Sequence, residues 1–101
     1  MKNKRGSSAQ ITMCYVIAYD ISEDRRHTRV HQILSGFGKW TQYSLFECFL
    51  TRKELILLQS RLDEYVINED SVRFYPLCAN CVKKVETIGD PPPKEDILFV
   101  V

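Results

Sequence analysis

Strand-type and helix-type hydrophobic patterns alternate along the chain. Residues 13–19 form a short apolar run rich in strand-forming residues, and Asp20 ends it. Apolar residues then recur at i, i+3, i+4 and i+7 over residues 30–37, which predicts an amphipathic helix that glycines terminate. Ser22 or Asp24 can cap the start of this helix. The first part of the chain is therefore expected to form a strand followed by a helix.

The next segment permits two arrangements. Residues 40–50 are again rich in strand formers, but a single strand of that length would extend about 36 Å, which is long for a small domain. The segment is either one bent strand or two strands joined by a tight turn near Tyr43 and Ser44. No glycine or asparagine marks a turn there, so the pattern leaves both arrangements open.

The remaining elements complete a recognisable order. A capping box begins at Thr51, and leucines at helical spacing follow it. Residues 71–78 predict a strand that Pro76 places at a sheet edge or a bulge, and residues 83–88 predict one more short strand. This order fits an α+β fold, the ferredoxin-like βαββαβ sandwich, in which both helices cover one face of the sheet.

The chain has 101 residues and a mass of 11.8 kDa, which corresponds to a single domain. Residues 1–12 are polar and predict a flexible leader, and residues 13–90 carry the ferredoxin-like domain. Residues 91–101 predict a proline spacer and a C-terminal tail strand. The apolar end of this tail suits the addition of a strand to another subunit, and the alternatives are a return onto its own domain or a disordered tail.

Both faces of the first strand are apolar. Cys14, Val16 and Ala18 lie on one face, while Tyr15 and its alternate neighbours lie on the other. Since the helices of this fold cover only one face, the second face requires a partner. The sequence therefore predicts a homodimer that packs sheet to sheet about a two-fold axis.

Composition excludes several classes of protein. The hydrophobic fraction is 45% and the charged fraction 27%, as in ordinary globular proteins. No apolar run approaches the roughly 20 residues that span a membrane, and no apolar core follows the basic start as in a secretory signal. Four cysteines are too few for a disulfide scaffold, so reduced thiols and a cytoplasmic location are expected. The net charge of +1 argues against a generally cationic nucleic-acid binder.

Asp20 is the main candidate for chemistry. It lies at the end of the first strand, where a carboxylate can hold Mg²⁺ or cap a helix. Asp20 also shares its strand face with Val16 and Ala18, so a sheet-to-sheet dimer brings two copies of it toward the axis. Two carboxylates and one hard cation would form a divalent site that polarises a phosphoryl oxygen and activates water.

Basic residues near Asp20 suggest a nucleic-acid contact. Arg25, Arg26 and Arg29 begin the first helix, and Lys39 follows it. Guanidinium groups grip phosphates with two hydrogen bonds, although a solvated helix face is the alternative explanation. His27 and His31 have zinc-ligand spacing, but the sequence shows no third ligand.

Two further patterns allow a small metal-binding or RNA-binding module as a third interpretation. Cys78 and Cys81 form a CxxC pair, which requires Cys14 and Cys48 or a partner's thiols to complete a zinc site. A redox role is another option, and buried small apolar residues are the usual explanation of strand cysteines. Aromatic residues are numerous enough to stack bases, but the RNA-recognition signature is missing.

Taken together, these segments resemble the CRISPR-associated Cas2 family of endoribonucleases. The resemblance covers about residues 13–89, most of the chain, and the combination of motifs carries it. The motifs are YDISEDRR at residues 19–26, FGKWTQYSLFEC at residues 37–48 and VRFYPL at residues 72–77. The chain departs from the family pattern in its leader and its CxxC pair.

The resemblance implies a ferredoxin-like homodimer with metal-dependent endonuclease activity on RNA or DNA. Asp20 matches the metal-binding and catalytic aspartate of the family, with Mg²⁺ as its cofactor. Arg29 matches a position that is often basic. Family members act with the Cas1 integrase to acquire new spacers from foreign DNA. The alternative function is a non-catalytic dimeric scaffold that bridges DNA for Cas1.

Overall fold

The computed structural model describes residues 11–89, so the predicted spacer and tail and most of the predicted leader lie outside it. The chain forms a small single-domain α+β fold, as the patterns predicted. Its elements are β1 (Met13–Asp20), α2 (Asp24–Ser35), β2 (Lys39–Gln42), β3 (Leu45–Leu50), α3 (Arg52–Asp63), β4 (Ser71–Leu77) and α4 (Ala79–Lys83). No helix among the described residues is long and apolar enough to cross a membrane.

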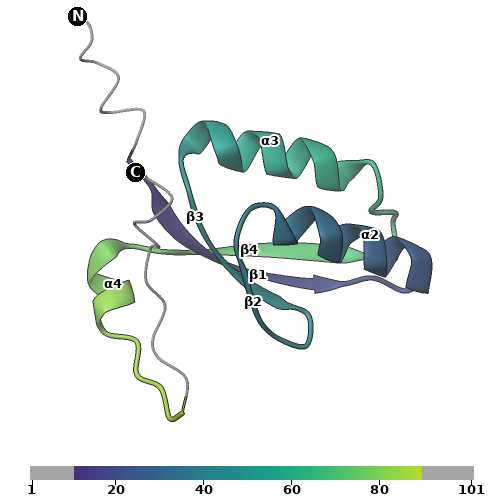
Figure 1. Ribbon diagram of the computed structural model, residues 1–101. Helices are drawn as coiled ribbons and strands as arrows, with labels where there is room; N and C mark the ends of the chain where they lie inside the picture. The colour runs from purple at the N-terminus through teal and green to yellow at the C-terminus, as the bar shows by residue number, and fades with distance from the viewer. Residues whose placement is uncertain (1–10, 90–101) are drawn as a thin grey trace, which may run out of the picture.

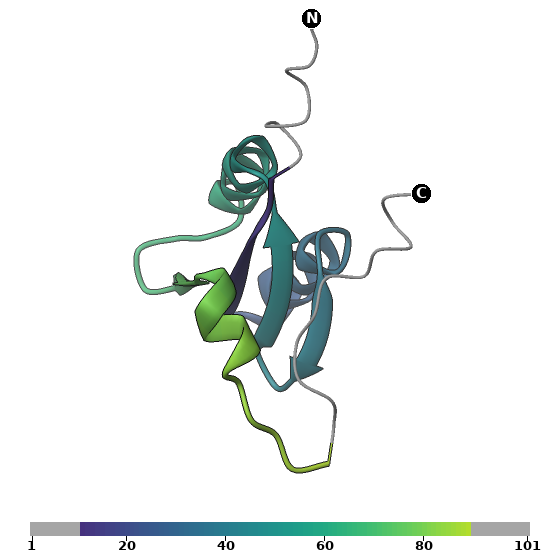
Figure 2. The ribbon, with the colours of Figure 1, turned by 90° about the vertical axis from the view of Figure 1, so that its left-hand side faces the viewer.

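The sheet has four antiparallel strands in the order β2-β3-β1-β4. α2 and α3 lie side by side over one face of this sheet, and α4 follows β4 at the end of the molecule (Figures 1 and 2). β4 is an edge strand, which explains why it tolerates Pro76, a residue without a backbone N–H. The prediction that proline marks an edge is confirmed.

The face of the sheet under α2 and α3 contains the core. Ile17 pairs in register with Phe46 on β3 and Phe74 on β4, and the first two side chains are fully buried. α2 contributes Val30 and Leu34 to this core. α3 adds a stripe of three leucines, Leu55, Leu58 and Leu62. The capping box predicted at Thr51 is present, with reciprocal bonds between Thr51 and Glu54.

The opposite face of the sheet, called the outer face below, is only partly covered. Each row of this face has a β1 residue at its centre, flanked by its register partners on β3 and β4. The rows are Cys14 with Phe49 and Leu77, Val16 with Glu47 and Tyr75, Ala18 with Leu45 and Arg73, and Asp20 with Ser71. Val16, Ala18 and Leu45 are half-buried, and Tyr75 is 47% exposed. Both faces of β1 are thus apolar, as predicted, but the helices within residues 11–89 cover only one of them.

Residues 40–50 form two strands rather than one bent strand. Tyr43, with φ of 48°, makes the left-handed turn between β2 and β3, a conformation that usually requires glycine or asparagine. The carbonyl of Tyr43 accepts a hydrogen bond from the Trp40 indole at 2.7 Å, which holds this turn. The absence of a turn residue explains why the sequence left the choice open.

Two local predictions are wrong. Glu23, and neither Ser22 nor Asp24, caps α2, because its carboxylate accepts the backbone N–H groups of Arg25 and Arg26. Residues 83–88 form no strand. Helix α4 occupies residues 79–83, and a turn follows it in which the Val85 N–H donates to the Val82 carbonyl. Apolar residues recur there every three positions rather than every two, which disfavours a strand.

Candidate metal and nucleic-acid site

Asp20 is the last residue of β1 and is exposed on the outer face. Its register partner is Ser71 on β4, in the row directly after Ala18 and Arg73. This placement confirms that Asp20 shares a face with Val16 and Ala18. A free carboxylate is an oxygen ligand of the kind that Mg²⁺ prefers, so the residue is chemically suited to a hard cation.

The turn after Asp20 is fastened by the carboxylate of Asp70. Oδ1 of Asp70 accepts the backbone N–H of Ser22 at 2.9 Å and its hydroxyl at 3.0 Å. Oδ2 accepts the backbone N–H of Ile67 at 3.0 Å. These hydrogen bonds, led by the two from backbone N–H groups, hold the pKa of Asp70 well below its usual range. Asp70 therefore joins the β1–α2 turn to the α3–β4 loop as a charged anchor.

Arg26 completes this anchor. Its Nη2 lies 3.0 Å from Oδ2 of Asp70, whose side chain is fully shielded from solvent, and 3.2 Å from the Ser22 hydroxyl. Its Nε is buried and has no hydrogen-bond partner among residues 11–89. The guanidinium of Arg26 is thus bound to a shielded carboxylate of the protein, and its neighbours Arg25 and Arg29 are more exposed.

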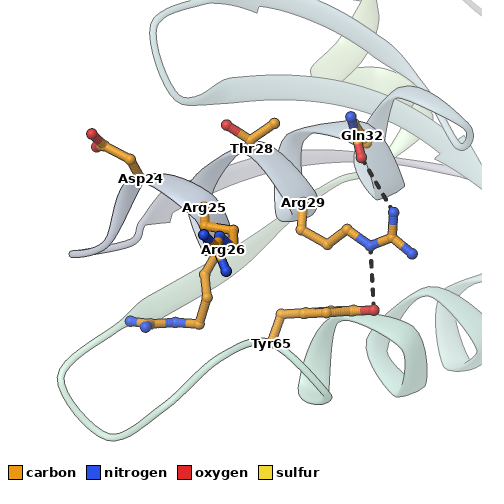
Figure 3. Close-up of a pocket in the computed structure, with 7 residues that line it drawn as sticks. All are labelled: Asp24, Arg25, Arg26, Thr28, Arg29, Gln32 and Tyr65. Carbon is orange, nitrogen blue, oxygen red and sulfur yellow. Dashed lines mark hydrogen bonds between the residues drawn. The ribbon is translucent and has the colours of Figure 1, made fainter.

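An open hollow of about 600 Å³ lies along α2 and contains three arginines (Figure 3). Its lining residues are Asp24, Arg25, Arg26, Thr28, Arg29, Gln32 and Tyr65. Arg29 lies over the Tyr65 ring, 5.5 Å from its centre, and Nε donates to the Tyr65 hydroxyl at 3.2 Å. This hydrogen bond raises the pKa of Arg29, whose guanidinium is charged at neutral pH in any environment. The hollow therefore presents oriented positive charge suited to phosphate.

Lys39 lies apart from this hollow. It pairs in register with Glu47, which places it at the β2 side of the outer face. Burial raises the pKa of Glu47, while the charge of Lys39 acts in the opposite direction. The structure thus gathers Arg25, Arg26 and Arg29 in one hollow and leaves Lys39 on another surface, and Asp20 does not line the hollow.

The side chains of His27 and His31 contact residues of the sheet and of the β2–β3 turn. Nδ1 of His31 lies 2.8 Å from the Tyr19 hydroxyl, and Nε2 of His27 lies 3.4 Å from the Ser44 hydroxyl. Across residues 11–89, no three His, Cys, Asp or Glu side chains are placed to share a metal ion. A divalent cation at Asp20 would thus need water or a second copy of the chain for its remaining ligands.

The sequence did not identify Asp70, Gln32 or Tyr65 as part of this region, and it named Ser22 only as a possible helix cap and as part of the YDISEDRR motif. Tyr65 continues the leucine spacing of α3, a pattern that is typical of core residues, and only its position under Arg29 shows a second role. Asp70 follows the end of this spacing, and its partner Ser22 lies 48 positions earlier in the chain. No local pattern connects two residues that are so far apart.

Comparisons with known proteins agree on one family. The family model for CRISPR associated protein Cas2 matches residues 13–85. A CRISPR-associated endoribonuclease Cas2 of Synechocystis sp. is 47% identical over 79 residues, which cover 77% of this chain and 86% of that protein. The crystal structure of Streptococcus pyogenes Cas2 has a TM-score of 0.67 and 31% identity, and the match covers 76% of this chain and all of the other.

A chain from a partial Cas6-RT-Cas1–Cas2 complex has a TM-score of 0.69. At 23% identity, and with 84% of this chain and 98% of the other covered, it shows a likeness of fold. The family model spans all four strands and the helices α2 and α3 described above. The resemblance seen in the three sequence motifs is therefore confirmed, and the chain belongs to the CRISPR-associated Cas2 family.

Proposed function

We propose that this protein is a homodimeric, Mg²⁺-dependent endonuclease of the CRISPR spacer-acquisition machinery that hydrolyses phosphodiesters of RNA or DNA. Membership of the Cas2 family supports this proposal, as does the endoribonuclease name of the Synechocystis relative. The observation that carries it is the position of Asp20, a free carboxylate at the end of β1 on the outer face.

The dimer follows from the outer face. The strand order β2-β3-β1-β4, with α2 and α3 on one side, supports the ferredoxin-like arrangement. Apolar side chains such as Val16 and Leu45 remain half-buried on the other side, where a second copy would complete their burial. In a sheet-to-sheet dimer, the two copies of Asp20 lie on the shared face.

Asp20 is the residue that would hold Mg²⁺. When bound, the ion would supply polarisation of a phosphoryl oxygen and activation of water. Asp70 keeps the turn after Asp20 in one conformation through the Ser22 backbone and hydroxyl. The carboxylate is therefore presented from the end of a paired strand whose following turn is hydrogen-bonded to Asp70, which favours a precise ligand position.

The arginines of the α2 hollow and Lys39 would bind the nucleic-acid backbone. Arg25 and Arg29 have exposed guanidinium groups, and Tyr65 orients that of Arg29. Arg26 contributes by fixing the turn, since the carboxylate of Asp70 balances its charge. These contacts carry no base information, so they suit a protein that handles many sequences.

The second candidate function is a non-catalytic scaffold that bridges DNA for a Cas1 integrase. One observation favours it: residues 11–89 of a single chain provide no cluster of three metal ligands. The same fold occurs in a complex that contains Cas1. In this function, the basic surfaces bind DNA as above and Asp20 has a structural role.

Replacement of Asp20 by Asn separates the two functions. The nuclease proposal predicts that Asp20→Asn abolishes Mg²⁺-dependent cleavage of RNA and DNA while the dimer persists. Asp63→Asn on the exposed surface of α3 removes the same charge and should cleave normally. Cleavage that survives in Asp20→Asn refutes the role of this carboxylate. Spacer acquisition that survives without cleavage shows that the scaffold is the biological function.

A further inference from the structure

The four cysteines form two chemically different pairs. Cys14 and Cys48 are 2% and 0% exposed, and burial raises their pKa values to about 11 and about 12. Such thiols stay protonated and inert at neutral pH. Cys78 and Cys81 are exposed, on the segment that leaves β4 and enters α4. Neither has a place in the proposed nuclease or scaffold function.

The exposed pair is arranged for mutual reaction. The sulfur atoms of Cys78 and Cys81 lie 3.3 Å apart, and the backbone N–H of Cys81 donates to the Cys78 sulfur at 3.4 Å. These hydrogen bonds lower the pKa of Cys78, while the neighbouring sulfur raises the pKa of Cys81. Cys78 is therefore the thiol with the greater thiolate population, and Cys81 is held beside it.

We propose that Cys78 and Cys81 form a redox-active dithiol that undergoes thiol–disulfide exchange with low-molecular-weight disulfides. Cys78 loses its proton to water and attacks one sulfur of the disulfide, which breaks that S–S bond and releases one thiolate. Cys81 then loses its proton and attacks the Cys78 sulfur, which releases the second thiolate. The dithiol loses two electrons and two protons, and the small disulfide gains the two electrons.

Metal binding is the weaker explanation of this pair. A tetrahedral zinc site takes four ligands, and two thiolates supply half of them. In the described part of the chain, no third His, Cys, Asp or Glu joins the pair. Exchange with a disulfide needs only the two sulfurs in contact and open access to them, and both conditions are met.

The test is incubation of the full reduced chain with oxidised glutathione, followed by intact-mass and peptide mass spectrometry. The expected product has lost two hydrogen masses, with Cys78 joined to Cys81. Cys14 and Cys48 serve as internal controls and should stay reduced until the protein is unfolded. Cys81→Ser should stop at one glutathione on Cys78. Cys78→Ser should react with oxidised glutathione at no more than about one tenth of the wild-type rate.

Three results would overturn the proposal. One is a wild-type protein that resists oxidised glutathione, and another is separate glutathione adducts on both cysteines without an internal bridge. The third is a Cys78→Ser variant that reacts as fast as the wild type. If either variant fails to fold, the wild-type product alone decides, because bridged and doubly modified chains differ in mass.

Discussion

The two faces of the sheet differ although the same strands build both. On the helix-covered face, Ile17 and Phe46 are completely buried by residues of the same chain. On the outer face, the adjacent row of Val16, Glu47 and Tyr75 remains half-buried or exposed. In the proposed dimer, alternate residues of β1 would serve folding and association separately, so substitutions on the two faces should have separable effects.

The difference between the two faces of the sheet is most strongly tested by Phe46→Ala. Because Phe46 is 0% exposed in the core, its truncation should cost about 3–5 kcal/mol of unfolding free energy. Urea denaturation at low protein concentration measures the loss. The matched control is Phe49→Ala on the outer face, which should cost clearly less. Equal losses at the two positions would show that the faces are energetically alike.

A charge on the outer face should have the next largest effect. Val16→Lys places a cation in the proposed interface, where Glu47 and Tyr75 flank it in register. Even with Glu47 beside it, a cation buried between two apolar sheet faces keeps a desolvation cost, which should weaken the proposed dimer by about 100-fold. Sedimentation equilibrium measures this change. Ile56→Lys, at an exposed apolar position of α3, should leave the molar mass unchanged. An unaltered dimer in Val16→Lys would remove this face from the interface.

The anchor at Asp70 predicts a particular response to acid. The pKa of Asp70 is lowered in the folded protein, so its contribution is complete above the unfolded value of about 4 and is lost as the pH falls below it. The wild type should therefore lose more stability below pH 4 than Asp70→Asn does, and Asp70→Asn should be less stable near neutrality. Thermal unfolding across pH tests this, with exposed Asp63→Asn as the control. Parallel pH profiles for the wild type and Asp70→Asn would contradict it.

The smallest effect concerns the hairpin turn, which belongs to neither face. Tyr43 is 85% exposed and has a positive φ of 48°, so its side chain contributes strain and little packing. Tyr43→Gly should raise the unfolding free energy by up to about 1 kcal/mol. Tyr43→Ala retains the strained backbone and should show no such gain. If the glycine variant is no more stable than the alanine variant, the turn is unstrained.

Elements with strong periodicity were predicted from the sequence, and contacts between distant segments were not. Apolar spacing identified β1, α2, α3 and β4, and strand parity placed Asp20 on the face of Val16 and Ala18. Tyr43 concealed the hairpin, because the pattern contains no residue that favours left-handed backbone. Residues 83–88 were predicted as a strand because three of them are β-branched, although the apolar residues recur every three positions rather than every two.

The arginines of α2 also show that the sequence does not predict contacts between distant segments. Arg25, Arg26 and Arg29 are equivalent in the sequence, since all three begin one helix. The fold distinguishes them, because Asp70 forms an ion pair with Arg26 and the Tyr65 hydroxyl accepts a hydrogen bond from Arg29. Both partners lie beyond α3, so only the tertiary structure assigns a different environment to each guanidinium.

The anchor at Asp70 also sets an order of events during synthesis. Asp70 leaves the ribosome 48 positions after Ser22, the residue that it fastens. Until then, the nascent chain can fold β1 and α2, but the turn between them has no carboxylate to close it. A product that ends before Asp70 would carry Asp20 without this constraint, so the setting of the Asp20 carboxylate is finished only once Asp70 has been synthesised.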